Sequence, residues 1–150
     1  MNIQQYKVRL LELEKKVISL IHAEIDLLNA HSKGWVERVE RGGFFDGDTP
    51  GGANIFEYAS LSAGGAVVAA EKKAFSLMRP PGHHAGINGR AIGAPTLGFC
   101  YLNNIAIAVR HLNKPALILD IDGHHGNGTE EIFKGDPRVT VISLHRIGIY

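Results

Sequence analysis

A short and almost wholly apolar run, residues 115–121, leads directly into a polar, glycine-rich loop that extends from Asp122 to Gly128. Such a run is typical of a parallel strand covered on both faces, because a strand with one exposed face alternates apolar and polar residues. In open α/β sheets, ligands bind just beyond the carboxyl ends of these strands. The loop is therefore the predicted position of a functional site.

The side chains at this strand end are those of a metal site. Asp122 and His124 lie two positions apart, so in an extended exit from the strand both project to the same side. Carboxylate oxygen and imidazole nitrogen suit zinc or another first-row divalent ion, and iron(II) is compatible with the same ligands. Asp120 lies on that face one step earlier, where a carboxylate commonly orients a neighbouring imidazole.

A second histidine pair strengthens this interpretation. His83 and His84 follow two prolines and a glycine, and before these a short apolar segment, residues 74–78, is a candidate strand. The prolines and the glycine stiffen and turn the chain, which would hold the adjacent imidazoles in a fixed orientation. Histidine is the usual side chain for moving protons near neutral pH. Either motif alone is more typical of a solvated loop, but the two together favour a catalytic metal site.

Four motifs follow one another along the chain: Arg-Pro-Pro-Gly-His-His-Ala at 79–85, Gly-Phe-Cys-Tyr-Leu-Asn-Asn at 98–104, Asp-Ile-Asp-Gly-His-His-Gly-Asn-Gly-Thr at 120–129 and Ile-Ser-Leu-His-Arg at 142–146. In type and order they resemble the zinc-dependent histone deacetylase superfamily, which also contains acetylpolyamine amidohydrolases and acetoin-utilisation proteins. The resemblance covers roughly residues 25–150. It implies a parallel, doubly wound α/β sheet of the arginase/deacetylase type and hydrolysis of acetyl-lysine or acetylpolyamine amides.

The resemblance also implies catalytic roles. His84 matches the general base and acid of the family, and His83 matches the histidine that supports it electrostatically. Asp120 matches the acid behind His83, and Asn127 occupies the place behind His84. Because asparagine carries no negative charge, we expect His84 to be less basic than in relatives with an aspartate at that position.

The remaining matches concern bound ions and the substrate. Asp122 and His124 match two of the three protein ligands of the zinc. Gly98 and Phe99 match the wall of the tube that receives the acyl-lysine side chain, and Asp48 matches a rim carboxylate that holds the backbone of a peptide substrate. A structural potassium or sodium ion beside the zinc is implied by residues matching Asp120, Asp122, His124, Ser143 and Leu144.

The third zinc ligand of the family, an aspartate, and a tyrosine that binds the oxyanion are both expected downstream of Tyr150. Residues 1–150 are therefore interpreted as about the first half of a deacetylase domain, with the doubly wound sheet incomplete. Two ligands alone should hold zinc weakly, so the chain by itself is predicted to be inactive. A non-catalytic product that binds a partner through the edge of its half-sheet is an alternative.

A dinuclear ureohydrolase like arginase is a further alternative, because it shares the fold. That family carries a bridging carboxylate two positions after the ligand histidine, where this chain has Gly126, so a single metal is favoured. Histone lysine, lysine in other proteins and acetylated polyamines are all candidate substrates, since an acidic rim at Asp48 suits peptides and cationic amines alike. Acyl-chain length and oligomeric state stay open.

Composition argues against other functions. The 16 Lys and Arg against 15 Asp and Glu give a net charge of +1, which does not favour binding to nucleic acid. No apolar run approaches the roughly 18 residues of a membrane span. The single cysteine, Cys100, excludes an internal disulfide and fits a reducing compartment. We therefore expect a cytoplasmic protein that does not bind membranes.

The rest of the chain is predicted to alternate helices and strands, the pattern of a parallel α/β sheet. Ser32 is expected to cap a helix through Arg41, and Gly64-Gly65 should let a small-residue helix pack closely on a sheet. The predicted segments are helices over 3–28, 33–41, 53–73, 103–112 and 129–133, a loop over 42–52, and strands over 116–120 and 139–144.

Overall fold

The computed structural model describes residues 3–5, 7, 9–10, 12 and 27–147. The described residues between 3 and 12 are helical, as the amphipathic pattern predicts, and residues 13–26 of that predicted helix lie outside the described part. No helix in the part of the chain that the structure describes is long and apolar enough to cross a membrane.

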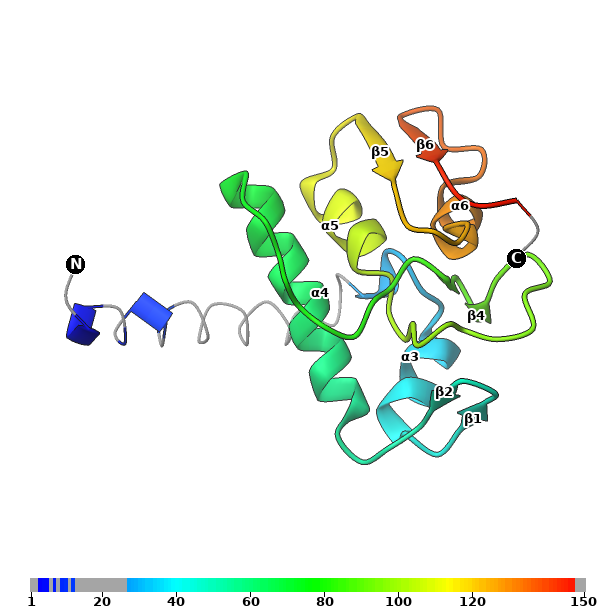
Figure 1. The fold of residues 1–150 in the computed structure, drawn as a ribbon, viewed down its shortest axis with the longest axis horizontal. Helices are drawn as coiled ribbons and strands as arrows, with labels where there is room; N and C mark the ends of the chain where they lie inside the picture. The colour runs from blue at the N-terminus through cyan, green and yellow to red at the C-terminus, as the bar shows by residue number, and fades with distance from the viewer. Residues whose placement is uncertain (1–2, 6, 8, 11, 13–26, 148–150) are drawn as a thin grey trace.

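Four helices and three two-stranded sheets form the body of the described chain from residue 27 onward (Figure 1). In chain order they are α3 Lys33–Arg41, β1 Phe45–Asp46, β2 Thr49–Pro50, α4 Ile55–Lys72, β3 Ala85–Gly86, β4 Gly89–Arg90, α5 Asn104–Leu112, β5 Ala116–Asp120, α6 Asn127–Phe133 and β6 Val139–Ser143. The long helix α4 packs against α5, and the β5–β6 pair lies on the opposite side of the molecule from the β1–β2 hairpin.

The strands β5 and β6 form a parallel pair, which confirms the pairing direction predicted for the apolar run. Their register places Ala116 opposite Val139 and Asp120 opposite Ser143. The hydrogen bonding continues one residue beyond β6, because the Leu144 N–H donates to the Asp120 carbonyl at 2.8 Å. The predicted bounds of β5 are confirmed, and β6 ends one residue earlier than predicted.

The predicted doubly wound sheet is only partly present. Among the described residues β5 pairs with β6 alone, and the other two sheets are short antiparallel hairpins. Residues 74–78, a candidate strand, pair with no other strand in the described chain, and Phe75 and Leu77 there are 86% and 87% exposed. The expectation that β5 is covered on both faces is wrong, since Leu117 and Leu119 are 66% and 57% exposed. Leu117 and Leu119 line an open groove together with Ile105 and Val109 of α5.

The helix ends follow the expected capping chemistry. The Ser32 hydroxyl accepts the Trp35 N–H at 3.3 Å, so Ser32 caps α3 as predicted. Asn103 caps α5 in the same way, because its side-chain oxygen accepts the Ala106 N–H at 3.1 Å. Helix α6 begins at Asn127, two residues before the predicted start.

Two further expectations are corrected. The predicted loop over 42–52 contains the β1–β2 hairpin, whose turn places Gly47 at φ +57°. Gly64-Gly65 packs α4 not onto a sheet but against a helix and an extended segment: a Cβ atom at Gly65 would lie 2.6 Å from Cγ of Met78. The glycine therefore admits the segment that leads to the histidine pair.

Buried polar contacts fix the segments around the site. Trp35 Nε1 donates to the Tyr101 carbonyl at 2.8 Å, and the Tyr101 hydroxyl donates to the Pro50 carbonyl at 2.6 Å. Buried His31 uses both ring nitrogens: Nδ1 lies 2.8 Å from the Gly86 carbonyl, and Nε2 accepts the Asn103 N–H at 2.8 Å. His31 is therefore neutral with its proton on Nδ1. These bonds join β3, α3 and the start of α5.

Candidate metal and catalytic site

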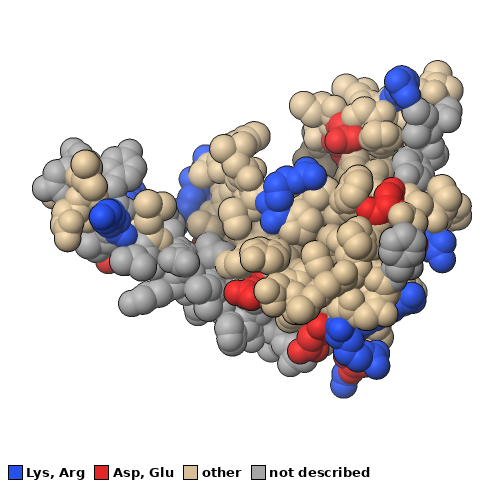
Figure 2. Space-filling model, turned by 60° about the horizontal axis from the view of Figure 1, so that its bottom comes forward, with Lys and Arg blue, Asp and Glu red and all other residues tan. Residues whose placement is uncertain are grey.

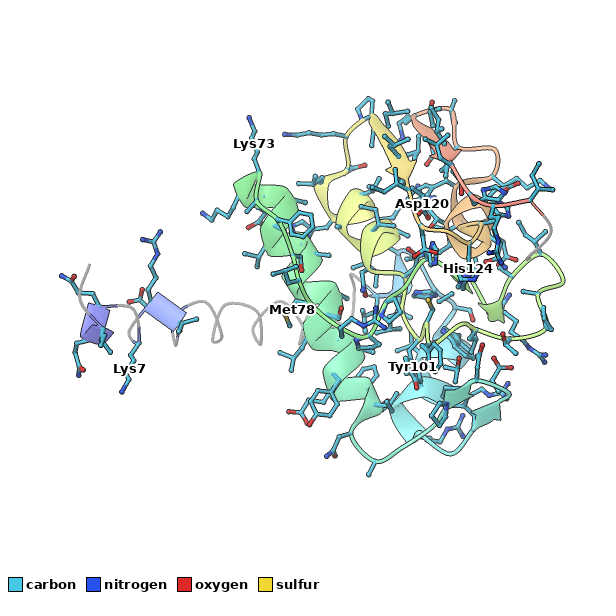
Figure 3. All side chains as sticks on the ribbon, viewed as in Figure 1. Lys7, Lys73, Met78, Tyr101, Asp120 and His124 are labelled. Carbon is cyan, nitrogen blue, oxygen red and sulfur yellow. The ribbon has the colours of Figure 1, made fainter. Side chains whose placement is uncertain are left out.

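Three segments bring the predicted site residues together. They are the loop before β3 with the His83–His84 pair, the loop after β5, and the first turn of α6 with Asn127. Figure 3 shows Asp120 at the end of β5 and His124 in the loop that follows. The ring centroids of His83 and His84 are 4.1 Å apart, and those of His84 and His124 are 6.0 Å apart.

His83 is held by a carboxylate. Its Nδ1 lies 2.8 Å from Oδ2 of Asp120, and both side chains are largely buried. Burial raises the pKa of Asp120, but the hydrogen bonds from His83 and from the Asp122 N–H outweigh it and hold the pKa below its usual value. A Cβ atom at Gly126 would overlap Oδ2 of Asp120. Glycine at that position therefore leaves room for the His83–Asp120 pair.

His84 is held by an amide. Its Nδ1 lies 2.6 Å from Oδ1 of Asn127, whose Nδ2 donates to the Ala91 carbonyl at 2.8 Å. Because the Asn127 oxygen can only accept, the network assigns the proton of neutral His84 to Nδ1 and the lone pair to Nε2. Burial lowers the pKa of His84, and its hydrogen bond to Asn127 offsets this only in part. The geometry favours a neutral imidazole that can accept a proton at Nε2.

Asp122 and His124 fit two positions of a zinc site. Oδ1 of Asp122 lies 3.2 Å from Nδ1 of His124, a hydrogen-bond contact. Two ligands at zinc-bonding distance on a tetrahedral ion are about 3.3 Å apart, so an ion could replace this hydrogen bond without moving the two side chains far. Partial burial raises the pKa of Asp122, but the hydrogen bond from the His124 N–H and the nearby imidazoles outweigh this effect and hold the pKa below its usual value. The carboxylate is therefore ionised, as a metal ligand must be. No group of three or more His, Cys, Asp or Glu side chains that could hold a metal ion occurs within the described ranges.

The residues implied in a monovalent-cation site also lie together. The β5–β6 register sets Asp120 beside Ser143, and the Gly126 N–H lies 3.5 Å from the Ser143 hydroxyl. Leu144 is held to Asp120 by the backbone bond already described. The structure thus places these residues around the turn after β5, and their role as cation ligands stays a prediction.

Gly98 and Phe99 lie beside His84. Gly98 has φ +54°, and a Cβ atom there would lie 2.5 Å from Cδ2 of His84. The Phe99 side chain is 54% exposed next to it. This placement is compatible with the predicted wall of a substrate tube.

Asp48 anchors the loop that carries Gly98. Its carboxylate accepts the hydroxyls of Thr49 and Thr96 at 2.7 and 2.8 Å and the Gly98 N–H at 3.1 Å. Burial raises the pKa of Asp48, but these hydrogen bonds outweigh it, so the pKa lies below its usual value. Its predicted contact with a substrate backbone stays a prediction.

Three residues near the site were missed by the sequence interpretation. Thr49 is buried and accepts the Phe99 N–H at 2.8 Å, so together with Asp48 it fixes the segment that carries Gly98 and Phe99. Ala91 contacts Asn127 through its backbone carbonyl, and no sequence pattern reveals such a contact. Glu131 could have been found from the sequence, because it lies four positions after Asn127 and therefore on the same face of α6.

The pattern characteristic of the histone deacetylase domain matches residues 3–150 of this chain. The chain belongs to the histone deacetylase family. The predicted family is thereby confirmed, and the arginase-like alternative loses its support.

Relatives within and beyond bacteria agree with this assignment. A probable deacetylase of Archaeoglobus fulgidus is 44% identical over 140 residues, which make up 83% of this chain and 37% of that protein. A histone deacetylase-like amidohydrolase of Pseudomonas aeruginosa is 37% identical over 142 residues, which make up 83% of this chain and 36% of that protein. The chain spans about two fifths of the length of the curated relatives it matches.

A solved structure supports the fold. The crystal structure of the HDA15 HD domain superposes with a TM-score of 0.72 at 36% identity, covering 83% of this chain and 38% of that one. The described chain is therefore a mixed α/β fold that resembles part of a histone deacetylase domain.

Proposed function

We propose that the protein to which this chain belongs is a zinc-dependent deacetylase that hydrolyses the amide of acetyl-lysine or of an acetylpolyamine. The proposal rests on one arrangement: a two-ligand pair, Asp122 and His124, lies beside His84, whose Nδ1 is held by Asn127. The names of the relatives, probable deacetylase and deacetylase-like amidohydrolase, support the same reaction class.

In the proposed reaction, the residues of this chain would bind the metal ion, transfer protons and orient the histidines. Asp122 and His124 would hold the ion together with a ligand from outside this chain. A bound zinc ion, or iron(II) in its place, supplies a Lewis acid that lowers the pKa of water to about 7. His84 accepts the proton of the attacking water at Nε2 and delivers it to the departing amine. Asp120 keeps His83 in a fixed orientation and stabilises any positive charge on its ring.

The substrate would approach along Gly98 and Phe99. Because Gly98 packs directly against the His84 ring, an extended acyl-lysine or acylated amine that runs along Gly98 and Phe99 would lie close to His84. Asp48 would bind the substrate backbone or an amine from the rim of this passage. A potassium or sodium ion held by Asp120, Asp122, His124, Ser143 and Leu144 would stabilise the loop after β5. The single cysteine fits the proposed cytoplasmic location.

The test uses the complete protein that contains this chain, loaded with zinc. Acetate release is measured from acetylated histone peptides, from other acetyl-lysine peptides and from acetylated polyamines, and metal content is measured on the same samples. His84→Ala should abolish turnover while the metal stays bound, whereas Asp122→Ala should lose both. Glu40→Ala, an exposed change on α3, should alter neither. Full activity in the His84→Ala protein would reject the mechanism.

A second candidate function is partner binding by a non-catalytic half-domain. It is favoured by the uncovered apolar face of β5, where Leu117, Leu119 and Ile121 are 66%, 57% and 76% exposed. An open groove of about 610 Å³ runs along this strand toward His83 and Asp122. The complete, zinc-loaded protein should then release no acetate from any of the three kinds of substrate, whereas the proposed deacetylase should release it from at least one, and this distinguishes the two candidates.

A further inference from the structure

We propose that Glu131, on α6, is a positioning residue for His84. It acts through the peptide unit that joins Ala91 to Ile92 and through the side chain of Asn127. The inference rests on the proposed deacetylase function for its catalytic meaning, while the contacts that carry it belong to the described structure.

The peptide unit between Ala91 and Ile92 is bound at both of its ends. Its carbonyl accepts the Nδ2 amide proton of Asn127 at 2.8 Å and the Ala94 N–H at 3.0 Å. Its N–H donates to Oε2 of Glu131 at 3.3 Å. Because the carbonyl and the N–H of one trans peptide point in opposite directions, the bonds at its two ends together fix its orientation.

The other carboxylate oxygen of Glu131 binds the far side of the same hairpin. Oε1 accepts the Ile87 N–H at 2.9 Å, directly after β3. A Cβ atom at Gly86 would lie 2.9 Å from Cδ of Glu131 and 2.7 Å from Cβ of Ala91, so the hairpin lies closely against the carboxylate. Glu131 therefore joins both arms of the β3–β4 hairpin to α6.

The backbone that Glu131 holds is not one that the chain would adopt without support. Ile92 has φ +49°, and a β-branched residue in the left-handed region is strained. Such a conformation persists only where the surroundings hold it. With the Glu131 bond removed, rotation of the Ala91–Ile92 peptide would relieve the strain, break the bond from the Ala94 N–H and turn the carbonyl away from Asn127.

The orientation of the Ala91–Ile92 peptide affects His84 through the side chain of Asn127. The Ala91 carbonyl accepts Nδ2 of Asn127, and this leaves Oδ1 of Asn127 as the atom that faces Nδ1 of His84. Without that carbonyl, the Asn127 amide can turn over and present Nδ2 to His84 instead. The ring proton would then move to Nε2, and His84 could no longer accept a proton from water at that nitrogen. Asn127 and Glu131, one helical turn apart, thus act on the two ends of one peptide.

A double-mutant cycle in the complete, zinc-loaded protein tests the pathway. Glu131→Ala should lower kcat about tenfold, as loss of an outer hydrogen-bond partner commonly does, with KM unchanged. In an Asn127→Ala background the same change should alter kcat less than about twofold, because the route to His84 is already broken. Equal losses in both backgrounds would overturn the proposal. If Glu131→Ala fails to fold, Glu131→Gln, which keeps the length and one acceptor, replaces it in the cycle.

A spectroscopic measurement separates this inference from the proposed function. The ¹⁵N spectrum of labelled histidine should show His84 with its proton on Nδ1 in the unmodified protein and a population with the proton on Nε2 in Glu131→Ala. An unchanged His84 signal would reject the positioning role whether or not the protein hydrolyses acetylated substrates. Glu57→Ala, an exposed carboxylate on α4, is the matched control and should change neither the spectrum nor kcat.

Discussion

Gly98 and His84 meet across the site at a distance that admits no larger side chain. Gly98→Ala would place Cβ 2.5 Å from Cδ2 of His84, on a backbone with φ +54°. We expect the displaced imidazole to lower kcat of the complete protein about a hundredfold, because small misplacements of a catalytic group are costly. Acetate release, with circular dichroism as a check on folding, measures the effect.

Gly93→Ala separates steric displacement from backbone strain. Gly93 also has positive φ, +70°, but a Cβ atom there would meet nothing within 4 Å. It should cost some stability and leave kcat close to that of the unmodified protein. Equal losses of kcat in the two variants would show that His84 is not displaced by the Gly98 methyl group.

His31 should make folding stability depend on pH. Burial lowers its pKa from 6.5 to about 4, so the folded chain excludes a proton that the unfolded chain binds. Its stabilising effect is therefore complete above pH 6.5 and is lost as the pH falls toward 4. The free energy of unfolding should fall by about 2 kcal/mol between roughly pH 7 and pH 5 from this residue. Urea unfolding at the two pH values measures it.

His31→Asn is the control for this dependence. Asparagine can still donate a hydrogen bond toward the Gly86 carbonyl but does not titrate. The variant should be less stable at neutral pH and should lose most of the decline toward acid. A decline of unchanged size would assign the pH dependence to other groups.

At the scale of elements, α6 packs against the backbone of the histidine loop without an intervening side chain. A Cβ atom at Gly128 would lie 2.5 Å from the carbonyl carbon and oxygen of Ala85 and from the carbonyl carbon of His84. Gly128→Ala should therefore lower the free energy of unfolding by about 1–3 kcal/mol, since backbone cannot move aside as a side chain can. Thermal or urea unfolding is the measurement.

Gly34→Ala in α3 provides the matched comparison. A Cβ atom there would meet nothing within 4 Å, and alanine favours the helix. It should stabilise the chain by about 0.5–1 kcal/mol. Destabilisation by both changes would contradict the steric explanation for Gly128.

Local patterns predicted several elements well. Ser32 and the apolar spacing after it define α3, and the apolar run 116–120 defines β5, because capping and periodicity act within a few residues. The β1–β2 and β3–β4 hairpins have strands of only two residues, which are too short to show the alternation of apolar and polar residues that predicts a strand. Residues 74–78 carry a strand-like pattern, but a strand also needs a partner, and none pairs with them in the described chain.

At the scale of the whole molecule, charge is dispersed and apolar surface is concentrated. On the face shown in Figure 2, Lys and Arg alternate with Asp and Glu between large uncharged areas, in keeping with the net charge of +1. The exposed apolar side chains of Leu117 and Leu119 in β5, and of Ile121 directly after it, instead lie close together along the chain. A face of this kind is typical of a surface that another part of a protein covers.

The chain produced alone should therefore self-associate. Leu117→Glu with Leu119→Glu should raise the monomer fraction, because two charges on that face oppose its burial. Sedimentation velocity over a range of concentrations measures the change. Tyr58→Glu, at an apolar side chain 55% exposed on α4, should have a much smaller effect. An equal effect would mean that β5 does not direct the association.

The sequence by itself determined the family, the two histidine pairs, the candidate ligands Asp122 and His124, and the main helices and the β5–β6 pair, because each depends on residue types at short, regular spacing. Only the tertiary structure decided how these residues are oriented. Asp48 holds the loop of Gly98 from 50 positions away, and Glu131 binds Ile92 across 39 positions. Such contacts depend on where the chain folds back on itself, and no local pattern contains that information.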